Sequence, residues 1–287
     1  MREIERIVGK HRCWLSQSDD MVARELKYLD EDLANESLAG LNNVPDSLEI
    51  LAVYHGKQGE VSVFSNDPSG WVDISRAIIY RYWALILRAK IFSKTRFLQN
   101  IRHSPNLTNQ LSGAGCLLAG FIAADRQDLA EPVADIIEGM YSVKGAVNPE
   151  YLKGRRFEPF MLWLYSAYVG RNVISLGKDM DLGVYQKLID AWVDEQKLSS
   201  ALVEVCQYHL DNSEDKGGRD PEFKSPPFDL LPLEMSAVFR VLKKSGFPLP
   251  VVASPLLSVG LAALENLIFK SDEVTQKVEA AYIKFFG

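Results

Sequence analysis

The chain has few cysteines, and they are far apart. Its three cysteines, Cys13, Cys116 and Cys206, lie roughly 90 to 100 residues apart, whereas zinc sites use short paired spacings and secreted scaffolds are cysteine-dense. We therefore expect reduced thiols. Cys116 and Cys206 stand in apolar helical contexts, so they are predicted to be small buried hydrophobes and not reactive groups.

Long apolar runs are also lacking. The segment Met1–Trp14 mixes charged residues with few apolar ones, so no signal-peptide core can be drawn through it. The run Ala77–Leu87 is interrupted by Arg81 and is well short of the roughly 20 apolar residues of a membrane span. We expect a cytosolic protein that does not engage a membrane.

Motifs for metal or cofactor chemistry are missing as well. Ser112–Gly115 is similar to a glycine-rich phosphate loop, but no Lys-Ser or Lys-Thr follows and no strand-helix alternation surrounds it, which favours helix packing. No Cys, Asp or Glu stands at ligand spacing from any of the four histidines, which are His11, His55, His103 and His209. We predict no catalytic, metal-binding or cofactor-binding residue and no enzyme. An unfamiliar helical active site would instead require a deep polar pocket near His103 or His209.

What the sequence does contain is an ordinary globular composition with an uneven charge. Hydrophobic residues make up 47% and charged residues 24%, which predicts a sizeable core. With no clear linker, we predict one domain over residues 1–287, although two closely packed halves would also suit this length. Ile74–Ala124 holds seven Lys and Arg and no Asp or Glu, so the formal net charge of −6 leaves −13 elsewhere (−6 minus +7). An acidic exterior disfavours nucleic acid as a ligand and suits a basic protein partner.

Apolar residues at three- and four-residue steps predict a largely helical chain. A first helix is expected over Asp20–Leu38, ended by Asn42–Pro45, and a long central helix over Asp73–Leu98. Ala124–Asp128 predicts an abrupt reversal between two later helices. The other expected helices are Leu107–Ala124, Leu129–Tyr141, Phe160–Val169, Val184–Glu195, Ser199–Leu210, Leu230–Leu242 and Val274–Phe286.

One stretch favours strand. In Leu48–Phe64, glycines at positions 56 and 59 separate two apolar runs, and Val61–Phe64 alternates β-branched with other residues. The predicted fold class is therefore mainly α, an antiparallel helical bundle or array with a small β-element near residues 48–66.

The segment Asp211–Pro227 is the longest predicted loop, and its acidic residues outnumber its basic ones. A solvated connection that tolerates insertions is one interpretation. The other is a contact surface for a basic partner, in which charge speeds encounter and sets specificity. The candidate partner-binding residues are Asp211, Glu214, Asp215, Asp220 and Glu222.

Three sequence features follow one another along the chain: Gly59–Val63 before the helix that contains Trp83, the hairpin at Ala124–Asp128, and Leu231–Glu234 leading to Gly246–Val251. In this order they resemble the immunity protein 49 family of bacterial polymorphic toxin systems. The likeness covers Leu48–Leu257 and omits the first helix and the tail. A similar helical layout also occurs in polymorphic-nuclease immunity proteins.

The resemblance implies a protein that binds a cognate toxin effector in the cytosol and neutralises it by stoichiometric complex formation, without turnover. It transfers no catalytic residues. A nuclease, or another toxin with a basic active-site cleft, would suit the acidic charge, and the protein itself would be a monomer or homodimer. The alternative is a helical-repeat scaffold that joins cellular proteins, which the helix pairs equally allow.

Overall fold

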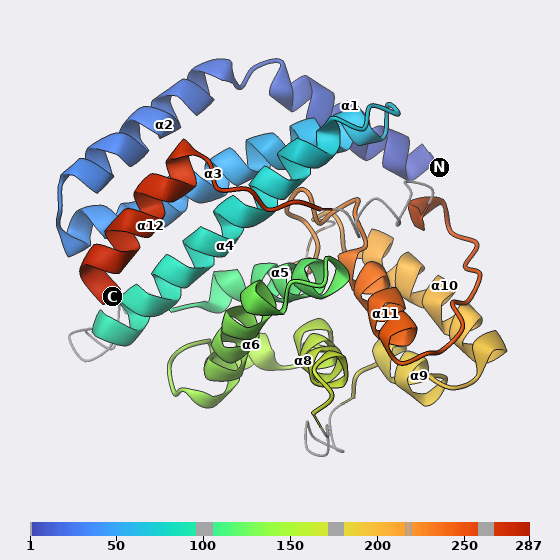
Figure 1. The fold of residues 1–287 in the computed structure, drawn as a ribbon. Coiled ribbons are helices and arrows are strands. Elements are labelled where there is room, and N and C mark those ends of the chain that lie inside the picture. Colours follow the sequence, from blue (N-terminus) through green and yellow to red (C-terminus); the bar gives the residue numbers. More distant parts are fainter. Residues whose placement is uncertain (1, 96–105, 172–180, 216, 218–219, 258–266) are drawn as a thin grey trace. The chain divides into compact units, whose positions relative to one another are not determined.

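The fold is helical throughout the part of the chain that the structure describes. This computed structural model describes residues 2–95, 106–171, 181–215, 217, 220–257 and 267–287, and every regular element in these ranges is a helix (Figure 1). The predicted mainly α class is confirmed. None of the described helices combines the length and apolar character that crossing a bilayer requires.

Internal packing divides the chain into two compact units. Unit 1 comprises residues 1–107 and 267–287, and unit 2 comprises residues 108–266. This division does not test the prediction of one domain over residues 1–287, which stays a prediction. Each unit is described by itself below.

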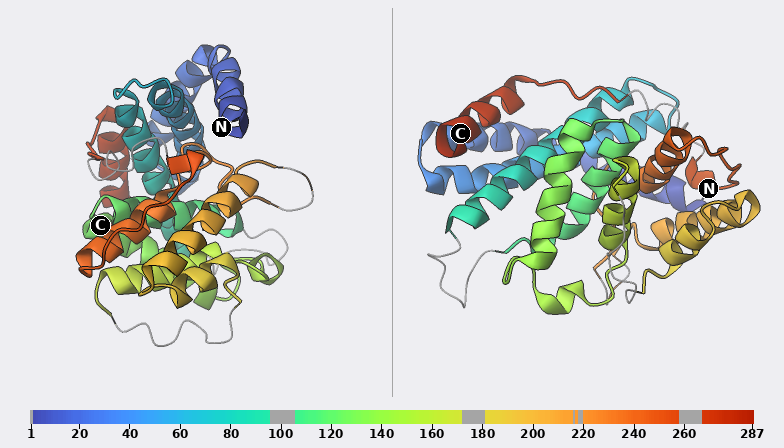
Figure 2. Two further views of the ribbon diagram at one scale, coloured as in Figure 1. Left: turned by 90° about the vertical axis from the view of Figure 1, so that its right-hand side faces the viewer. Right: turned by 60° about the horizontal axis from the view of Figure 1, so that its bottom comes forward.

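Unit 1 is built around a helical hairpin. Helices α3 and α4 pack along each other, α1 and α2 pack on α3, and α12, from the far end of the chain, packs on α4 (Figures 1 and 2). The helices are α1 (Arg2–Leu15), α2 (Asp19–Ala34), α3 (Leu38–Val63), α4 (Gly70–Thr95) and α12 (Glu273–Phe286).

The β-element expected near residues 48–66 is wrong, because this stretch belongs to α3. Leu48, Leu51 and Ala52 are almost completely buried. They stand at positions i, i+3 and i+4, which share one face of a helix, whereas a strand would bury every second residue. The expected stop at Asn42–Pro45 is also wrong, since Pro45 lies inside α3. The first predicted helix ends earlier, at Ala34, and α3 begins at Leu38. Ser37 Oγ caps α3 by accepting a hydrogen bond from Gly40 N at 3.0 Å.

Glycine in α3 serves helix contact and not a hairpin turn. A Cβ atom on Gly59 would lie 2.7 Å from both Gly70 O and Ile74 Cγ1, and one on Gly70 would lie 2.5 Å from Gly59 O. Only a residue without a side chain lets the two backbones approach so closely. The feature that favoured a β-turn in the sequence is therefore the tightest point of the α3–α4 contact.

Unit 2 is arranged around α5, which packs against α6, α8 and α11. An apolar helix buried on almost all sides suits this central position. The reversal predicted at Ala124–Asp128 is confirmed, since α5 ends at Ala123 and α6 begins at Gln127. The helices are α5 (Leu111–Ala123), α6 (Gln127–Ser142), α7 (Pro149–Leu152), α8 (Phe157–Tyr168), α9 (Val184–Asp190), α10 (Glu195–Asp211) and α11 (Leu233–Lys244), with 3-10 turns at Thr108–Gln110 and Pro255–Leu257.

The cysteines follow their sequence interpretation. All three are free thiols, and Cys116 on α5 and Cys206 on α10 are buried. Burial raises the pKa of the Cys206 thiol to about 11, so this group stays protonated and unreactive at neutral pH.

The α3–α4 contact yields a stability prediction. Gly59→Ala places a methyl group against the α4 backbone and should lower the free energy of unfolding by about 1–3 kcal/mol, measured by urea denaturation. Gly9→Ala in α1 is the matched control, because a Cβ there meets nothing within 4 Å. It should stabilise unit 1 by about 0.5–1 kcal/mol through helix propensity. Equal effects of both substitutions would contradict the close approach.

Candidate functional site

The acidic residues predicted to bind a partner separate into surface and interior positions in unit 2. Asp211 ends α10 and is exposed, as are Asp215 and Asp220, and Glu214 is half-buried. Asp215 Oδ1 accepts a hydrogen bond from Gly217 N at 2.8 Å. A partner-binding role for these four residues stays a prediction.

Asp220 is tied to the rest of unit 2. Tyr151 OH donates a hydrogen bond to Asp220 Oδ2 at 3.0 Å, and Lys224 pairs with Oδ1. Partial burial opposes ionisation of this carboxyl group, but the hydrogen bonds from Lys224 and Tyr151 outweigh it and lower the pKa of Asp220. The carboxylate is therefore charged at neutral pH and held in place.

Glu222 is an interior residue, which corrects its assignment to an exposed contact surface. The residue is only 2% exposed. Tyr208 OH donates a hydrogen bond to Glu222 Oε2 at 2.7 Å, and Arg155 Nη1 lies 3.8 Å from Oε1. Its physical role is to balance a buried positive charge.

That charge, Arg155, is the centre of a buried polar cluster. Its Nε donates a hydrogen bond to Glu158 Oε2 at 3.2 Å, its Nη2 pairs with Glu158 Oε1 and with Ser112 Oγ, and its guanidinium lies 4.8 Å from the Tyr151 ring centroid. Burial disfavours the charged form, but Glu158 and Glu222 more than compensate and raise the pKa of Arg155 above its ordinary value. The cluster joins α5, α8 and the segment after α10.

His209 belongs to a second buried pair. Its Nδ1 lies 2.7 Å from Glu234 Oε1, its ring stacks on Phe223 with centroids 4.1 Å apart, and its side chain has no exposed surface. A substrate would have no access to this imidazole. The other histidine named for a possible enzymatic pocket, His103, lies outside the described residues.

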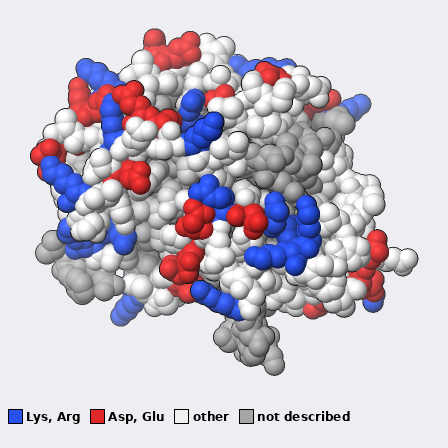
Figure 3. Space-filling model, in the orientation of Figure 1, with Lys and Arg blue, Asp and Glu red and all other residues white. Residues whose placement is uncertain are grey.

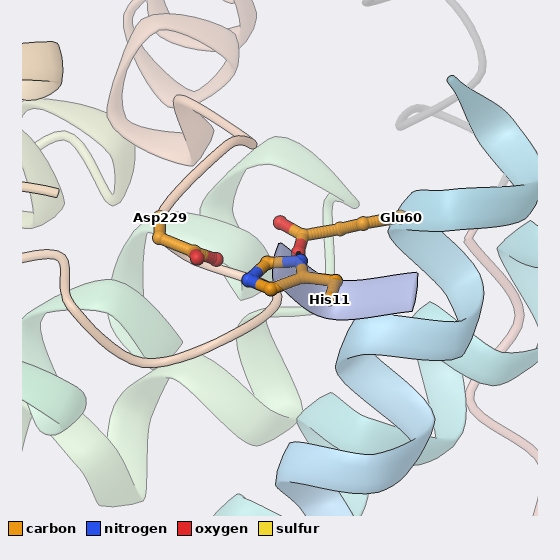
Figure 4. A group of neighbouring side chains, drawn as sticks. All are labelled: His11, Glu60 and Asp229. Carbon is orange, nitrogen blue, oxygen red and sulfur yellow. Dashed lines mark ion pairs between the residues drawn. The ribbon is translucent and has the colours of Figure 1, made fainter. Parts of the chain in front are cut away.

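Unit 1 has a comparable pair between its first and third helices. His11 on α1 and Glu60 on α3 are both buried, and His11 Nδ1 lies 3.1 Å from Glu60 Oε2; Figure 4 shows the imidazole facing this carboxylate. This pair ties α1 to the central hairpin. His11 has no Cys, Asp or Glu at ligand spacing in the sequence, and its partner in the structure is Glu60, which is distant along the chain.

A solvent-accessible polar group lies in a cleft of unit 1. His55 Nδ1 is 2.9 Å from Asp73 Oδ1, and Tyr80 OH donates a hydrogen bond to Asp272 Oδ2 at 2.7 Å. Arg76 bridges these two carboxylates, with distances of 3.5 Å to Asp73 and 3.3 Å to Asp272. The cleft has a volume of about 340 Å³ and places one histidine where a ligand could reach it.

An acidic stripe on α6 is the exposed feature that the sequence reasoning missed. Its four residues, separated by three, four and three positions, share one helical face and are exposed. Arg126 pairs with Asp128, and Arg171 pairs with Glu131. Among the described residues, none forms an ion pair with Asp135 or Glu138. The stripe consists of Asp128, Glu131, Asp135 and Glu138. Its spacing is readable in the sequence once α6 is taken as a helix.

A buried tyrosine on α8 interacts electrostatically with this stripe. Tyr165 on α8 is 3% exposed. Burial is the main cause that raises the pKa of Tyr165, and Glu131 and Asp135 raise it further while Arg171 acts in the opposite direction.

The net charge of the chain is carried by unit 2. Residues 108–266 contain 15 Lys and Arg against 21 Asp and Glu, a net charge of −6, whereas unit 1 contains 17 of each and is formally neutral. A basic macromolecule would therefore be attracted to unit 2. There the α6 stripe and the exposed acids of residues 211–220 offer the carboxylates.

Comparison with known proteins adds no assignment. No family model, curated protein or solved structure matches the chain. The candidate surfaces in unit 2 are therefore defined by their own exposure and charge, and they are two: the exposed acids of α6, and the separate group Asp211, Glu214, Asp215 and Asp220.

The buried cluster leads to a prediction about stability. Arg155→Ala leaves Glu158 and Glu222 as uncompensated buried charges and should lower the free energy of unfolding by about 3–5 kcal/mol. The matched control is Lys153→Ala, which removes an exposed pair with Glu150 and should change stability by less than about 0.5 kcal/mol. Urea denaturation followed by circular dichroism measures both. An Arg155→Ala protein as stable as the wild type would refute the central role of the cluster.

Proposed function

We propose that the chain is an immunity protein that binds a cognate bacterial toxin effector in the cytosol and neutralises it by forming a stoichiometric complex. The observation that carries the proposal is the concentration of the whole net charge of −6 in unit 2, with carboxylates exposed along α6. The resemblance to the immunity protein 49 family over Leu48–Leu257 supports it. A toxin with a basic cleft is the complementary partner.

The geometry of the stripe suits this partner. Successive carboxylates on one helical face stand about 5–6 Å apart, and the ten residues from Asp128 to Glu138 extend over about 15 Å. Such a row attracts a basic cleft at long range and fixes its register at contact. Because charge alone gives rate and specificity more than affinity, a tight complex also needs a packed interface of about 1,600 Å² in total.

Inhibition then requires no chemistry from this chain. Occupying a cleft that must receive an acidic substrate blocks turnover for as long as the complex persists. The buried polar pairs of unit 2, Arg155–Glu158 and His209–Glu234, serve rigidity in this scheme, since a preformed surface loses less conformational entropy on binding.

A co-expression experiment tests the proposal. We expect that producing the protein together with the product of its neighbouring gene restores growth that the second product alone prevents. The two should co-purify at 1:1 or 2:2 stoichiometry, measured by light scattering. Absence of toxicity and of a complex would contradict the immunity role and favour the helical scaffold, which predicts several partners of moderate affinity.

The acidic surface has its own test in that complex. Asp135→Lys with Glu138→Lys should slow association about tenfold or more at low salt and flatten its salt dependence, measured by surface plasmon resonance. Glu5→Lys with Glu279→Lys makes the same change of charge on exposed helices of unit 1 and is the matched control. If both double variants slow association equally, only net charge matters and the α6 site is wrong.

A further inference from the structure

The cleft of unit 1 that contains His55 takes no part in the proposed function. Its lining residues come from α2, α3, α4 and α12 with its N-cap Asp272, and its volume is about 340 Å³. This volume is at the lower end of the range for small-molecule sites. Two of the lining residues, Leu51 and Tyr80, are almost completely buried, so the cleft reaches down to the core of unit 1.

His55 offers this cleft a hydrogen-bond acceptor. Its Nδ1 lies 2.9 Å from Asp73 Oδ1, and because a carboxylate only accepts, the neutral ring carries its hydrogen on Nδ1 and a lone pair on Nε2. No described residue forms a hydrogen bond with Nε2, and this atom is not among the enclosed ones. Because His55 lines the cleft and Asp73 does not, Nε2, on the other side of the ring, is the nitrogen that a ligand can reach.

The charged side chains around the cleft leave an excess of negative charge. Two cations, Arg76 and Lys277, each pair with two of four carboxylates, which gives a formal charge of −2 with a neutral imidazole (+2 minus 4). The carboxylates are Asp30, Asp73, Asp272 and Glu273. Figure 3 shows acidic and basic side chains interspersed over this part of the surface. Local charge therefore favours a cation over an anion, and both basic side chains are already engaged.

Apolar surface is exposed in the same cleft. Leu26 on α2 is 38% exposed, and Val22 and Val274, which line the cleft with it, are half-buried. An alkyl chain that covers these side chains removes apolar area from water. The lining thus suits a ligand that combines an apolar stem with a cationic group that donates hydrogen bonds.

We propose that this cleft binds a primary ammonium group carried on a short alkyl chain. The ammonium donates a hydrogen bond to His55 Nε2, the excess carboxylates stabilise its charge, and the chain packs against Leu26 and its apolar neighbours. An ammonium has three donors and no acceptor, which matches a nitrogen with a lone pair, whereas a carboxylate has nothing to donate to it. The ligand does not have to break the existing ion pairs. The inference is independent of the proposed function, because every residue involved belongs to unit 1.

Three small molecules with the same butyl chain provide the first test. Butylamine, butanol and pentanoate carry a cationic, a neutral and an anionic head. In mildly alkaline buffer, butylamine should bind the full chain about tenfold more tightly than butanol, and pentanoate should not bind. Nuclear magnetic resonance of protein with nitrogen-15 in its imidazoles measures the titration. It also shows which nitrogen of His55 carries the hydrogen, and butylamine should shift the Nε2 signal.

Variants of the cleft are the second arm. His55→Phe keeps a ring and removes the acceptor, and it should weaken butylamine binding about tenfold or more. Glu273→Gln removes one carboxylate of the cleft and should weaken binding about twofold or more. Glu279→Gln makes the same change on the exposed side of α12, outside the cleft, and should leave binding unchanged. Circular dichroism checks folding, and the comparison of the three ligands on the wild type holds even if His55→Phe does not fold.

An alkyl ammonium group has two sources, a free amine and the lysine side chain of another protein. Lysine with both backbone ends blocked as amides distinguishes them. If it binds as tightly as butylamine, a lysine side chain can enter the cleft from a protein chain. If butylamine alone binds, the ligand is a free amine.

Three outcomes would overturn the proposal. The first is pentanoate binding as tightly as butylamine, because the cleft would then be an anion site. The second is a hydrogen on Nε2 of neutral His55. The third is unchanged butylamine binding by a folded His55→Phe protein, because the amine would then be attracted only by the general acidity of the surface.

Discussion

The buried charge of Arg155 determines which carboxylates of the segment after α10 stay in the interior of unit 2. A guanidinium in the interior must be neutralised, and Glu158 and Glu222 do so from α8 and from the segment after α10. Tyr151, stacked against the same guanidinium, also holds Asp220. The acidic segment after α10 is therefore partly interior, since Glu222 is buried and Asp220 is held by Tyr151.

Unit 1 follows from a different constraint, the close approach of α3 and α4 at Gly59 and Gly70. Because these two helices form the support, α2 is held by α3 and α12 by α4, and neither has to pack fully against the other. The ion pairs Lys277–Asp30 and Lys284–Glu36 join α12 to α2 and to the residue shortly after it.

Much of the helical pattern could be predicted from the sequence. The helices expected over Val184–Glu195 and Val274–Phe286 begin at or within one residue of α9 and α12, since caps and apolar spacing are local signals. The same local reasoning failed at Leu48–Phe64. Gly56, Gly59 and the β-branched residues near them favour a hairpin when read alone, but they belong to the long helix α3, in which Gly59 lies directly against α4.

The sequence by itself determined the mainly α class, the reversal between α5 and α6, the burial of Cys116 and Cys206, and the acidic balance, because these depend on composition and on neighbours a few residues away. Only the tertiary structure decided that Glu222 is an interior counter-ion while Asp215 is exposed, and that His209 is enclosed while His55 faces a cleft. The physical reason is that the environment of a charged side chain is set by residues distant in the chain. Arg155 and Glu222, 67 positions apart (222 minus 155), are such a pair.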